Sequence, residues 1–359
     1  AAQRQIRDAV ERAPAQSLLR RQSGLSGARD RRTSQVREAA AEVAAFVGAR
    51  PDDLVFVDNV TAGINAVLRS LTLEPGDEVL LTDHGYGAIA NAVRLIAGQR
   101  GVIVNTVRVP YPDYSPGALL AAVARAIVPR TRLAIVDHVT AESALVFSID
   151  ELVGVCQASG VRVLIDGAHA PGVLPLDVPA IGADWYAANL HKWACAPRSC
   201  GFLWASESAQ LDLHPPVISW GLDQGFTAEF DWVGTRDLSG WLAAPEGLAF
   251  LRDRGIDEAW TYNHGLAWQG AQLLAEAWRT EIPATEASIG FMATVPVPES
   301  FGGQPSDAIR LRDALLFDHG IEVQVHAGHG RVWVRISAQT YNDLDDVVKL
   351  SDAVLSLRR

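Results

Sequence analysis

An α/β fold, with a mainly parallel sheet in a large domain and a smaller α+β domain after it, is predicted by three features of the sequence. Short β-branched apolar runs alternate with helical patterns, and this alternation favours parallel crossover units. After about residue 245 the rhythm changes to a helix-rich stretch followed by separated strands. The length of 359 residues is enough for two domains.

The large domain is expected to contain buried strands separated by helices. The apolar runs that predict strands are 53–58, 77–83, 102–109, 132–139, 162–168 and 200–205. The helical patterns between them include 61–71, 87–99 and 115–127. Because helices that connect parallel strands cover both faces of a sheet, we expect a large domain over 21–245 with helices on both faces.

The small domain is expected to combine two distant parts of the chain. The start, AAQRQIRDAVERAPAQ, predicts an amphipathic helix rather than a signal peptide. Near the other end, a helix-rich stretch over 257–280 precedes the strands GFMATVPVP and VWVRIS, with another helix between them. We therefore expect residues 1–20 and 246–359 to form the small domain.

The composition is that of an ordinary globular protein, with 48% hydrophobic and 20% charged residues. The net charge of −11 disfavours a nucleic-acid partner, and no apolar run is long enough to cross a membrane. Cys156, Cys195 and Cys200 form no disulfide or metal pattern, which favours a reducing compartment. We expect a cytoplasmic protein that binds neither nucleic acid nor membrane.

An acid and an amine stand where the sequence predicts that both lose water, which is costly unless they are paired or used. Asp166 ends an apolar strand, so it could bond a protonated pyridine nitrogen and keep that ring an electron sink; the alternative is a cap in the following loop. Lys192 lies in ANLHKWACAPRSC, where a desolvated amine could form a Schiff base with an aldehyde. A surface lysine is the alternative, and it fits poorly beside Trp193.

Further polar residues follow other predicted strands, at the sheet edge where α/β proteins bind ligands. The helix start around Thr61 could cup a phosphate, or it could be a plain N-cap. His84, with Tyr86 beside it, could stack on a flat ring or pack in a loop. His169 could reach the ring oxygen and His191 the phosphate. Together these residues predict pyridoxal 5′-phosphate as the cofactor.

The segment HAGHG, residues 326–330, offers two histidines on a glycine-rich loop. Two ligands without a nearby carboxylate or cysteine are too few for a metal site. We expect a flexible loop and no metal.

These motifs resemble those of the class V aminotransferase family of fold-type I pyridoxal-phosphate enzymes, within it the isopenicillin N epimerase-like branch. The resemblance runs through nearly the whole chain. It is carried by NVTAGINAVLRSL, LTDHGYGA, LIDGAHAPG, ANLHKWACAPR, DWVGTRDLSGWLAAPEGLAFL and VRISAQTYN.

The resemblance implies a role for each matching residue. Lys192 is implied as the Schiff-base lysine, Asp166 as the partner of the pyridine nitrogen, and His169 as the residue near the ring oxygen. Arg335 is implied as the clamp for a substrate α-carboxylate, a role that suits a bidentate guanidinium. The other implied cofactor contacts are His84 on the ring, Thr61, Ala62 and His191 at the phosphate, and Asn189 where many relatives carry Ser.

Thr235, in GTRD, is implied as a phosphate contact from the second subunit of a homodimer, with the active site at the interface. Two departures from the family pattern leave the substrate open. No Asn/Gly-rich turn precedes residue 20, and Ser199 follows Arg198 where relatives carry Gly.

The reaction implied begins with an amino-acid substrate whose carboxylate is held by Arg335 and whose α-proton is taken by Lys192. We favour a C–S β-lyase that acts on an S-substituted cysteine, with a place in secondary metabolism, because the branch includes such lyases. An epimerase, which needs a second acid such as Tyr86 or His138, is an alternative. Decarboxylation-coupled oxidative deamination and transamination also stay open, whereas no cysteine of the desulfurase type is apparent.

Overall fold

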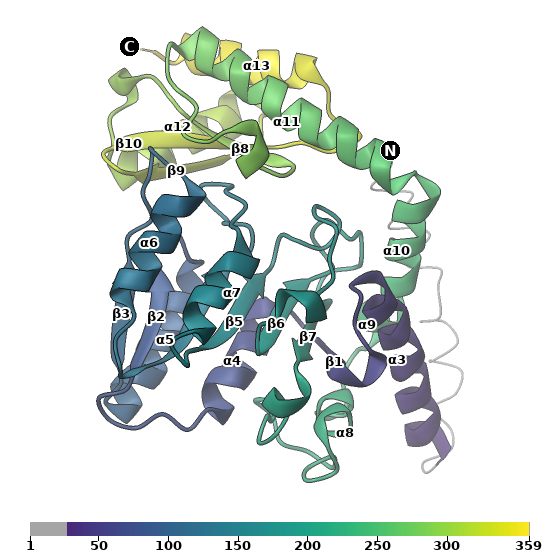
Figure 1. Ribbon diagram of the computed structural model, residues 1–359. Coiled ribbons are helices and arrows are strands. Elements are labelled where there is room, and N and C mark those ends of the chain that lie inside the picture. The colour runs from purple at the N-terminus through teal and green to yellow at the C-terminus, as the bar shows by residue number, and fades with distance from the viewer. Residues whose placement is uncertain (1–26, 359) are drawn as a thin grey trace. The chain divides into compact units, whose positions relative to one another are not determined.

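The computed structural model of the chain describes residues 27–358, with side chains from residue 33 onward (Figure 1). The helix expected at the very start of the chain lies outside the described residues. Contacts between Cα atoms divide the chain into two compact units. The second unit consists of the segments 110–118 and 140–147 and of the chain from Gly255 onward, and the first unit contains the other described residues.

The first unit is built on a seven-stranded sheet with the strand order β1-β7-β6-β5-β4-β2-β3. The strands are β1 (Leu54–Val57), β2 (Glu78–Thr82), β3 (Ile103–Val107), β4 (Thr131–Asp137), β5 (Arg162–Gly167), β6 (Trp185–Asn189) and β7 (Gly201–Ala205). Only β7 runs antiparallel to its neighbours, so the sheet is mainly parallel. The predicted fold class is confirmed. The sequence analysis missed β6, whose sequence WYAAN contains two alanines, which are poor strand formers.

Helices cover both faces of this sheet (Figure 1). On one face, a core that includes Leu164 and Ala187 packs against α4, α5 and α8. On the other face α7 packs on β5, and α3 packs with α9 and α10. The helices of this unit are α3 (Gly27–Phe46), α4 (Val60–Ser70), α5 (Gly87–Arg100), α7 (Ile149–Gln157), α8 (Phe226–Asp231), α9 (Ser239–Leu242) and α10 (Ala244–Asp253), while α6 (Pro116–Ala126) straddles the division between the units.

The second unit contains a three-stranded antiparallel sheet in the order β8-β10-β9. Its strands are β8 (Met292–Pro296), β9 (Gln324–Gly328) and β10 (Arg331–Ser337), and its helices are α11 (Ile256–Trp278), α12 (Pro305–His319) and α13 (Leu344–Ser356). The alternate residues Val332, Val334 and Ile336 of β10 share one apolar core with these helices. Short 3₁₀ helices occur in the two units at Pro51–Asp53, Pro179–Ile181, Glu207–Ala209, Glu286–Ser288 and Glu299–Phe301.

The two inner segments belong to the second unit because they pack on its small sheet. The ring centroids of Tyr111 and Trp333 lie 5.2 Å apart, and the Thr294 hydroxyl donates to Glu142 O at 2.8 Å. A guanidinium nitrogen of Arg335 donates to Ala141 O. The boundary proposed from the sequence, after residue 245, falls within α10, slightly before the division at Gly255.

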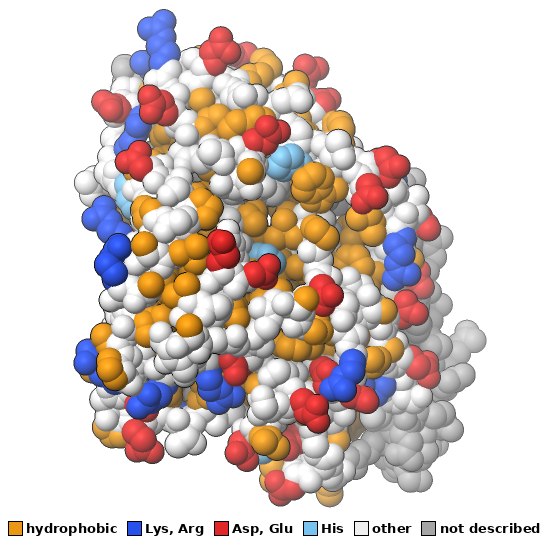
Figure 2. Space-filling view, in the orientation of Figure 1, with side chains coloured by type: hydrophobic (Ala, Val, Ile, Leu, Met, Phe, Trp, Pro, Cys, Tyr) orange, Lys and Arg blue, Asp and Glu red, His pale blue; other side chains and the backbone are white. Residues whose placement is uncertain are grey.

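No helix in the described part of the chain is both long and apolar enough to span a membrane. On the face shown in Figure 2, Lys and Arg side chains are scattered toward the rim and form no continuous basic patch.

Candidate active site

Strands of the first unit bring polar residues to one edge of the large sheet. β1, β2, β4, β5 and β6 all run in the same direction, so their carboxyl ends share an edge. The residues that end or closely follow these strands are Asn59, His84, Asp137, Asp166 and Asn189. The sequence analysis had assigned roles to three of them, His84, Asp166 and Asn189.

Asp166 is only 3% exposed, near the end of β5. Ala168 N–H donates to its Oδ1 at 3.0 Å. Burial raises the pKa of Asp166 to about 6, while the Ala168 N–H and the charge of Lys192 act in the opposite direction. Its neighbour Gly167 is required, because a Cβ there would lie 2.2 Å from the Tyr186 ring.

Lys192, His169 and Trp193 form a hydrogen-bonded chain. The indole Nε1–H of Trp193 donates to His169 Nδ1 at 3.2 Å, and His169 Nε2 lies 3.0 Å from Lys192 Nζ. Because Nδ1 of His169 accepts this hydrogen bond, the neutral His169 ring carries its proton on Nε2. The Nε2–H of His169 can donate only to an uncharged amine. The hydrogen bonds from Trp193 to His169 and from His169 to Lys192 therefore favour a neutral Lys192.

The expectation that Lys192 is buried is wrong: its side chain is exposed. The residue lies in an irregular loop after β6, and an apolar neighbourhood in sequence does not bury a loop residue. Asp166 is buried because its strand is central in the sheet.

The start of α4 offers one residue with free donors. Asn59 caps the helix by accepting from Ala62 N–H at 2.9 Å, and Asn189 Oδ1 accepts from Val60 N–H at 3.0 Å. Neither the backbone N–H nor the hydroxyl of Thr61 has a hydrogen-bond partner between residues 33 and 358. The N-cap is therefore present. Of the two α4 residues expected at a phosphate, Thr61 retains free donors, whereas the Ala62 N–H donates to the cap.

His84 is half-buried in the turn that follows β2, and Tyr86, 53% exposed, stands at the N-cap of α5. Two aspartic acid side chains hold this turn. Asp83 Oδ1 accepts from Val109 N–H at 2.8 Å, and the Asp137 carboxyl accepts from Tyr86 N–H. The position of His84 is thus set by both neighbouring strands.

His191 is half-buried, and its Nδ1 lies 2.7 Å from Cys200 O. Its pKa is lowered, chiefly by burial, although the bond to Cys200 acts in the opposite direction. Cys200 N–H also lies 3.4 Å from this nitrogen, so both backbone groups of Cys200 contact Nδ1, and Nε2 remains for a further ligand.

Thr235 is exposed in the loop between α8 and α9. Its neighbours fix this loop: Arg236 pairs with Asp58, and Asp237 Oδ1 accepts from Ser239 N–H at 2.9 Å. The loop is thus ordered on both sides of an exposed threonine.

Arg335 belongs to the second unit, on β10. One guanidinium nitrogen donates to Ala141 O, and Nε has no hydrogen-bond partner in the described chain. Burial lowers the pKa of Arg335. No carboxylate among the described residues forms a salt bridge with it, so the group has donors to spare for an anionic ligand.

His138, the other histidine weighed from the sequence, is engaged elsewhere. Its Nδ1 lies 2.8 Å from the Tyr186 hydroxyl, and burial lowers its pKa to about 4. A neutral, hydrogen-bonded imidazole is a poor proton donor to a substrate.

The sequence analysis missed Asp137 and the hydrogen bond of Trp193. A signal for Asp137 was present, because RLAIVDHV ends an apolar strand in an acid just as RVLIDGA does. The hydrogen bond from Trp193 to His169 joins residues 24 positions apart and depends on how their side chains are oriented, so no sequence pattern indicates it.

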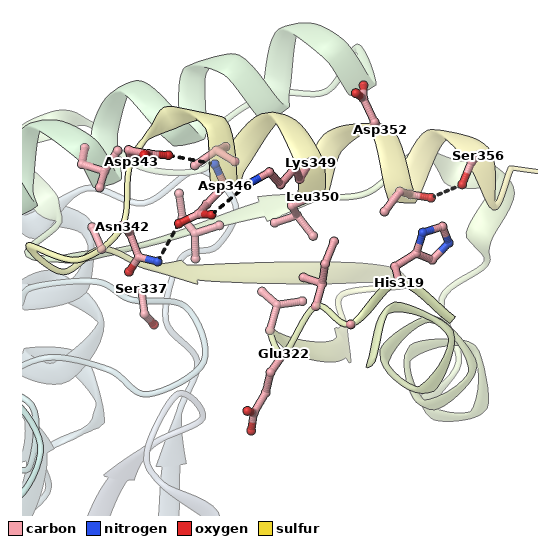
Figure 3. A pocket seen from close by; sticks show the side chains of 18 residues that line it. His319, Glu322, Ser337, Asn342, Asp343, Asp346, Lys349, Leu350, Asp352 and Ser356 are labelled. Atoms are coloured by element: carbon pink, nitrogen blue, oxygen red, sulfur yellow. Dashed lines mark hydrogen bonds and ion pairs between the residues drawn. The ribbon is translucent and has the colours of Figure 1, made fainter. Parts of the chain in front are cut away.

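Two other features lie outside this cluster. No group of three or more His, Cys, Asp or Glu side chains in the described residues could hold a metal ion. A groove of about 880 Å³ lies within the second unit, between α13 and the chain that follows α12 (Figure 3). It is lined by side chains such as Glu322 and Asp346 and contains none of the candidate residues.

Comparisons with known proteins give four findings. The sequence profile of the Aminotransferase class-V family matches residues 5–350. Putative L-cysteine desulfhydrase 1 of Oryza sativa subsp. japonica is 34% identical over 358 residues, which cover 90% of this chain and 74% of the relative. Isopenicillin N epimerase of Streptomyces clavuligerus is 32% identical over 338 residues, covering 89% and 84%. A solved complex of the cystine C–S lyase C-DES with cysteine persulfide matches 97% of this chain and 93% of its own, with a TM-score of 0.81 at 22% identity.

Proposed function

The chain belongs to the aminotransferase class-V family, whose members use pyridoxal 5′-phosphate, and on that premise we propose that it is a C–S β-lyase acting on cysteine or an S-substituted cysteine. The resemblance drawn from the motifs is thereby confirmed at the level of the family. Relatives named L-cysteine desulfhydrase support the lyase reaction, and so does the solved cystine C–S lyase with the same fold.

The donor set at the sheet edge fits this cofactor. Asp166 is a buried carboxylate with one N–H donor among the described residues, so it can accept a further bond from a protonated ring nitrogen. Thr61 has two free donors at a helix start, where a phosphate binds well. Lys192 supplies the amine that would hold the aldehyde covalently, and His84 would cover the ring. His191, on taking up a proton, would add a charged donor to the phosphate.

The observation that carries the proposal is the pair of hydrogen bonds that links Trp193 to His169 and His169 to Lys192. An amine must be uncharged both to join an aldehyde and to take a proton from carbon. The tautomer that Trp193 imposes on His169 favours that uncharged amine. When bound, the cofactor supplies an electron sink for the pair released at the substrate α-carbon.

The chain's own residues would then act in order. Arg335 would hold the substrate carboxylate through its spare donors, and Lys192 Nζ would take the α-proton. The electron pair would expel the sulfur from the β-carbon, and the proton held at Lys192 could be passed to the departing thiolate. Hydrolysis of the remaining fragment gives pyruvate and ammonia.

Epimerisation is the second candidate, because one relative is named isopenicillin N epimerase. It needs a second proton donor on the opposite face of the substrate. His138 is neutral and bonded to Tyr186, which leaves Tyr86, exposed beside His84, as the group to consider.

We also propose a homodimer, in which the exposed Thr235 contacts the phosphate of the partner's site. The three cysteines, Cys156, Cys195 and Cys200, are free, which supports the cytoplasm as the proposed compartment.

The test is a product screen of the cofactor-loaded protein with L-cysteine, S-substituted cysteines and other L-amino acids. Pyruvate, ammonia and the sulfur product, which is hydrogen sulfide from L-cysteine and a free thiol from an S-substituted cysteine, in equal amounts would establish the lyase. Deuterium entering the α-carbon from heavy water, with loss of optical purity and no pyruvate, would instead establish the epimerase. Lys192→Ala is the control: it should lose both the visible absorption of the lysine-bound cofactor and the turnover.

A further inference from the structure

Two carboxyl groups lie side by side at the edge of the large sheet. Asp137 and Asp166 occupy the same register position in the neighbouring parallel strands β4 and β5. They are 5% and 3% exposed. Neighbouring strands are about 4.8 Å apart, and residues in the same register of parallel strands point to the same face. Water therefore screens the repulsion between two negative charges at these positions only weakly.

Two buried carboxylates this close cannot both be ionised without a large cost. Asp166 receives an N–H bond from Ala168, and burial raises its pKa to about 6. The pKa of Asp137 is raised well above its usual range, first by burial and then by the charge of Asp166. A charged Lys192 would lower the pKa of both carboxyl groups, and even then its single positive charge could balance only one negative charge. The proton is therefore held by Asp137.

Asp137 also contacts the turn after β2. Its carboxyl accepts a hydrogen bond from Tyr86 N–H. A Cβ added to Gly85 would lie 3.5 Å from Asp137 Oδ2 and 3.2 Å from Thr82 O, so the turn lies close against the carboxyl. This turn carries His84.

We propose that Asp137 is a positioning residue that works as a neutral carboxylic acid: it holds the His84–Tyr86 turn in place and leaves Asp166 as the single anion beside the cofactor ring. The inference rests on the proposed function, because the cofactor gives Asp166 and His84 their roles. A second charge at Asp137 would raise the pKa of Asp166 and weaken its hold on a protonated ring nitrogen. A neutral acid avoids this and still accepts the Tyr86 bond.

The first experiment is spectroscopic and uses Asp137→Asn, because asparagine has the shape of a protonated aspartic acid. We expect this variant to bind the cofactor with nearly wild-type affinity and to keep the pH midpoint of its visible absorption within about half a pH unit. Removing a real charge one strand spacing away would move that midpoint by roughly two pH units, and such a shift would overturn the proposal. Asp231→Asn is the matched control, because Asp231 is also a buried acid but pairs with Arg37 in another part of the unit.

The second experiment needs no cofactor. A carboxyl that is protonated when folded and ionised when unfolded, with an unfolded pKa of about 3.9, destabilises the folded protein progressively as the pH rises above that value. Asparagine does not have this effect. The melting temperature of Asp137→Asn, minus that of the wild type, should therefore increase from about pH 4 to pH 7. A constant or falling difference would show an ionised Asp137 and refute the inference.

A variant outside the pair tests the contact with the turn. Gly85→Ala adds a Cβ 3.2 Å from Thr82 O, so the turn must shift by a few tenths of an ångström beside Asp137, and we expect cofactor affinity to fall severalfold because the Tyr86 bond is weakened. Wild-type affinity in this variant would contradict the positioning role. If the wild-type chain itself took up no cofactor, the proposed function would fail, whereas the melting experiment would still decide the protonation of Asp137.

Discussion

At the scale of single residues, Trp193 sets the tautomer of His169 through the hydrogen bond that its indole N–H donates. Trp193→Phe removes the indole donor and leaves most of the ring volume. His169 can then carry its proton on Nδ1 and accept from a charged Lys192, so the neutral amine becomes scarcer. We expect covalent uptake of the cofactor to slow about tenfold at neutral pH and to recover at higher pH.

Trp278→Phe is the matched control for this prediction. Trp278 is a buried tryptophan whose Nε1–H has no hydrogen-bond partner in the described chain, so the same change removes no bond there. Stopped-flow absorbance measurements at several pH values would follow the uptake. Equal rates in both variants would rule out the tautomer mechanism.

Which residues the sequence could predict depended on whether the backbone fixed them. Asp166 is found where the sequence put it because an apolar strand leads to it and ends there. Lys192 lies in a loop, three residues after Asn189 at the end of β6, and its exposure could not be inferred from its neighbours. Its bond to His169 is a tertiary contact, which sequence spacing does not encode.

At the scale of elements, the N-terminus of α4 is held by one cap and offers one residue to a ligand. Asn59→Ala removes the cap, which should lower the free energy of unfolding by about 1 kcal/mol and also weaken cofactor binding, because the Thr61 N–H loses its orientation. Calorimetry and cofactor titration measure the two effects separately.

The control is Asp343→Ala, which removes the equivalent cap of α13, where Asp343 accepts from Asp346 N–H at 3.2 Å. It should cost a similar free energy and leave cofactor affinity unchanged. A loss of affinity in both variants would mean that binding follows overall stability rather than the local geometry of α4.

The end of β5 depends on a close contact with its neighbour β6. Gly167→Ala forces a Cβ into the ring of the fully buried Tyr186 and should cost about 1–3 kcal/mol of stability. Gly154→Ala in α7 is the contrasting change, because nothing lies within 4 Å of the added Cβ and alanine favours helix. Thermal melting should show a loss for the first and a small gain for the second; a harmless Gly167→Ala would mean that Tyr186 moves aside easily.

Elements with a clear period were predictable, and those without one were not. β4 and β5 are unbroken apolar runs, and both were expected within two residues of their observed ends. β6 was missed because Ala187 and Ala188 carry no strand signal, and tertiary burial between β5 and β7 decides their conformation.

At the scale of the whole molecule, the proposed dimer predicts complementation between two inactive variants. Lys192→Ala lacks the amine, and Thr235→Ala lacks the phosphate contact that we assign to the partner. In a mixed dimer, one site has both residues intact and the other has neither. After random exchange of subunits, about a quarter of all sites should be active.

Activity that appears only after the two variants are mixed and refolded together would support a site shared between subunits. Thr235→Ala mixed with itself is the control. No recovery, with mixed dimers demonstrated by a tag on one variant, would mean that Thr235 serves its own chain or no site.

The two-part organisation could be predicted from the change of rhythm, but the membership of residues 110–118 and 140–147 in the second unit could not. Each is a short connection after a strand of the large sheet, and its local sequence resembles any other connection. Contacts such as those of Tyr111 with Trp333 join residues more than two hundred positions apart.

Because residues 110–118 and 140–147 belong to the second unit, they affect how the chain can fold during synthesis. The residues that connect β3 to α6 and β4 to α7 leave the ribosome more than a hundred residues before the small sheet on which they pack. Until the last third of the chain has been made, Tyr111 lacks the rings of His329 and Trp333 on which it packs. A fragment that ends at Arg254 would retain the whole large sheet and yet expose the Tyr111 side chain, so we expect it to require a chaperone or to aggregate, whereas the complete chain buries this side chain.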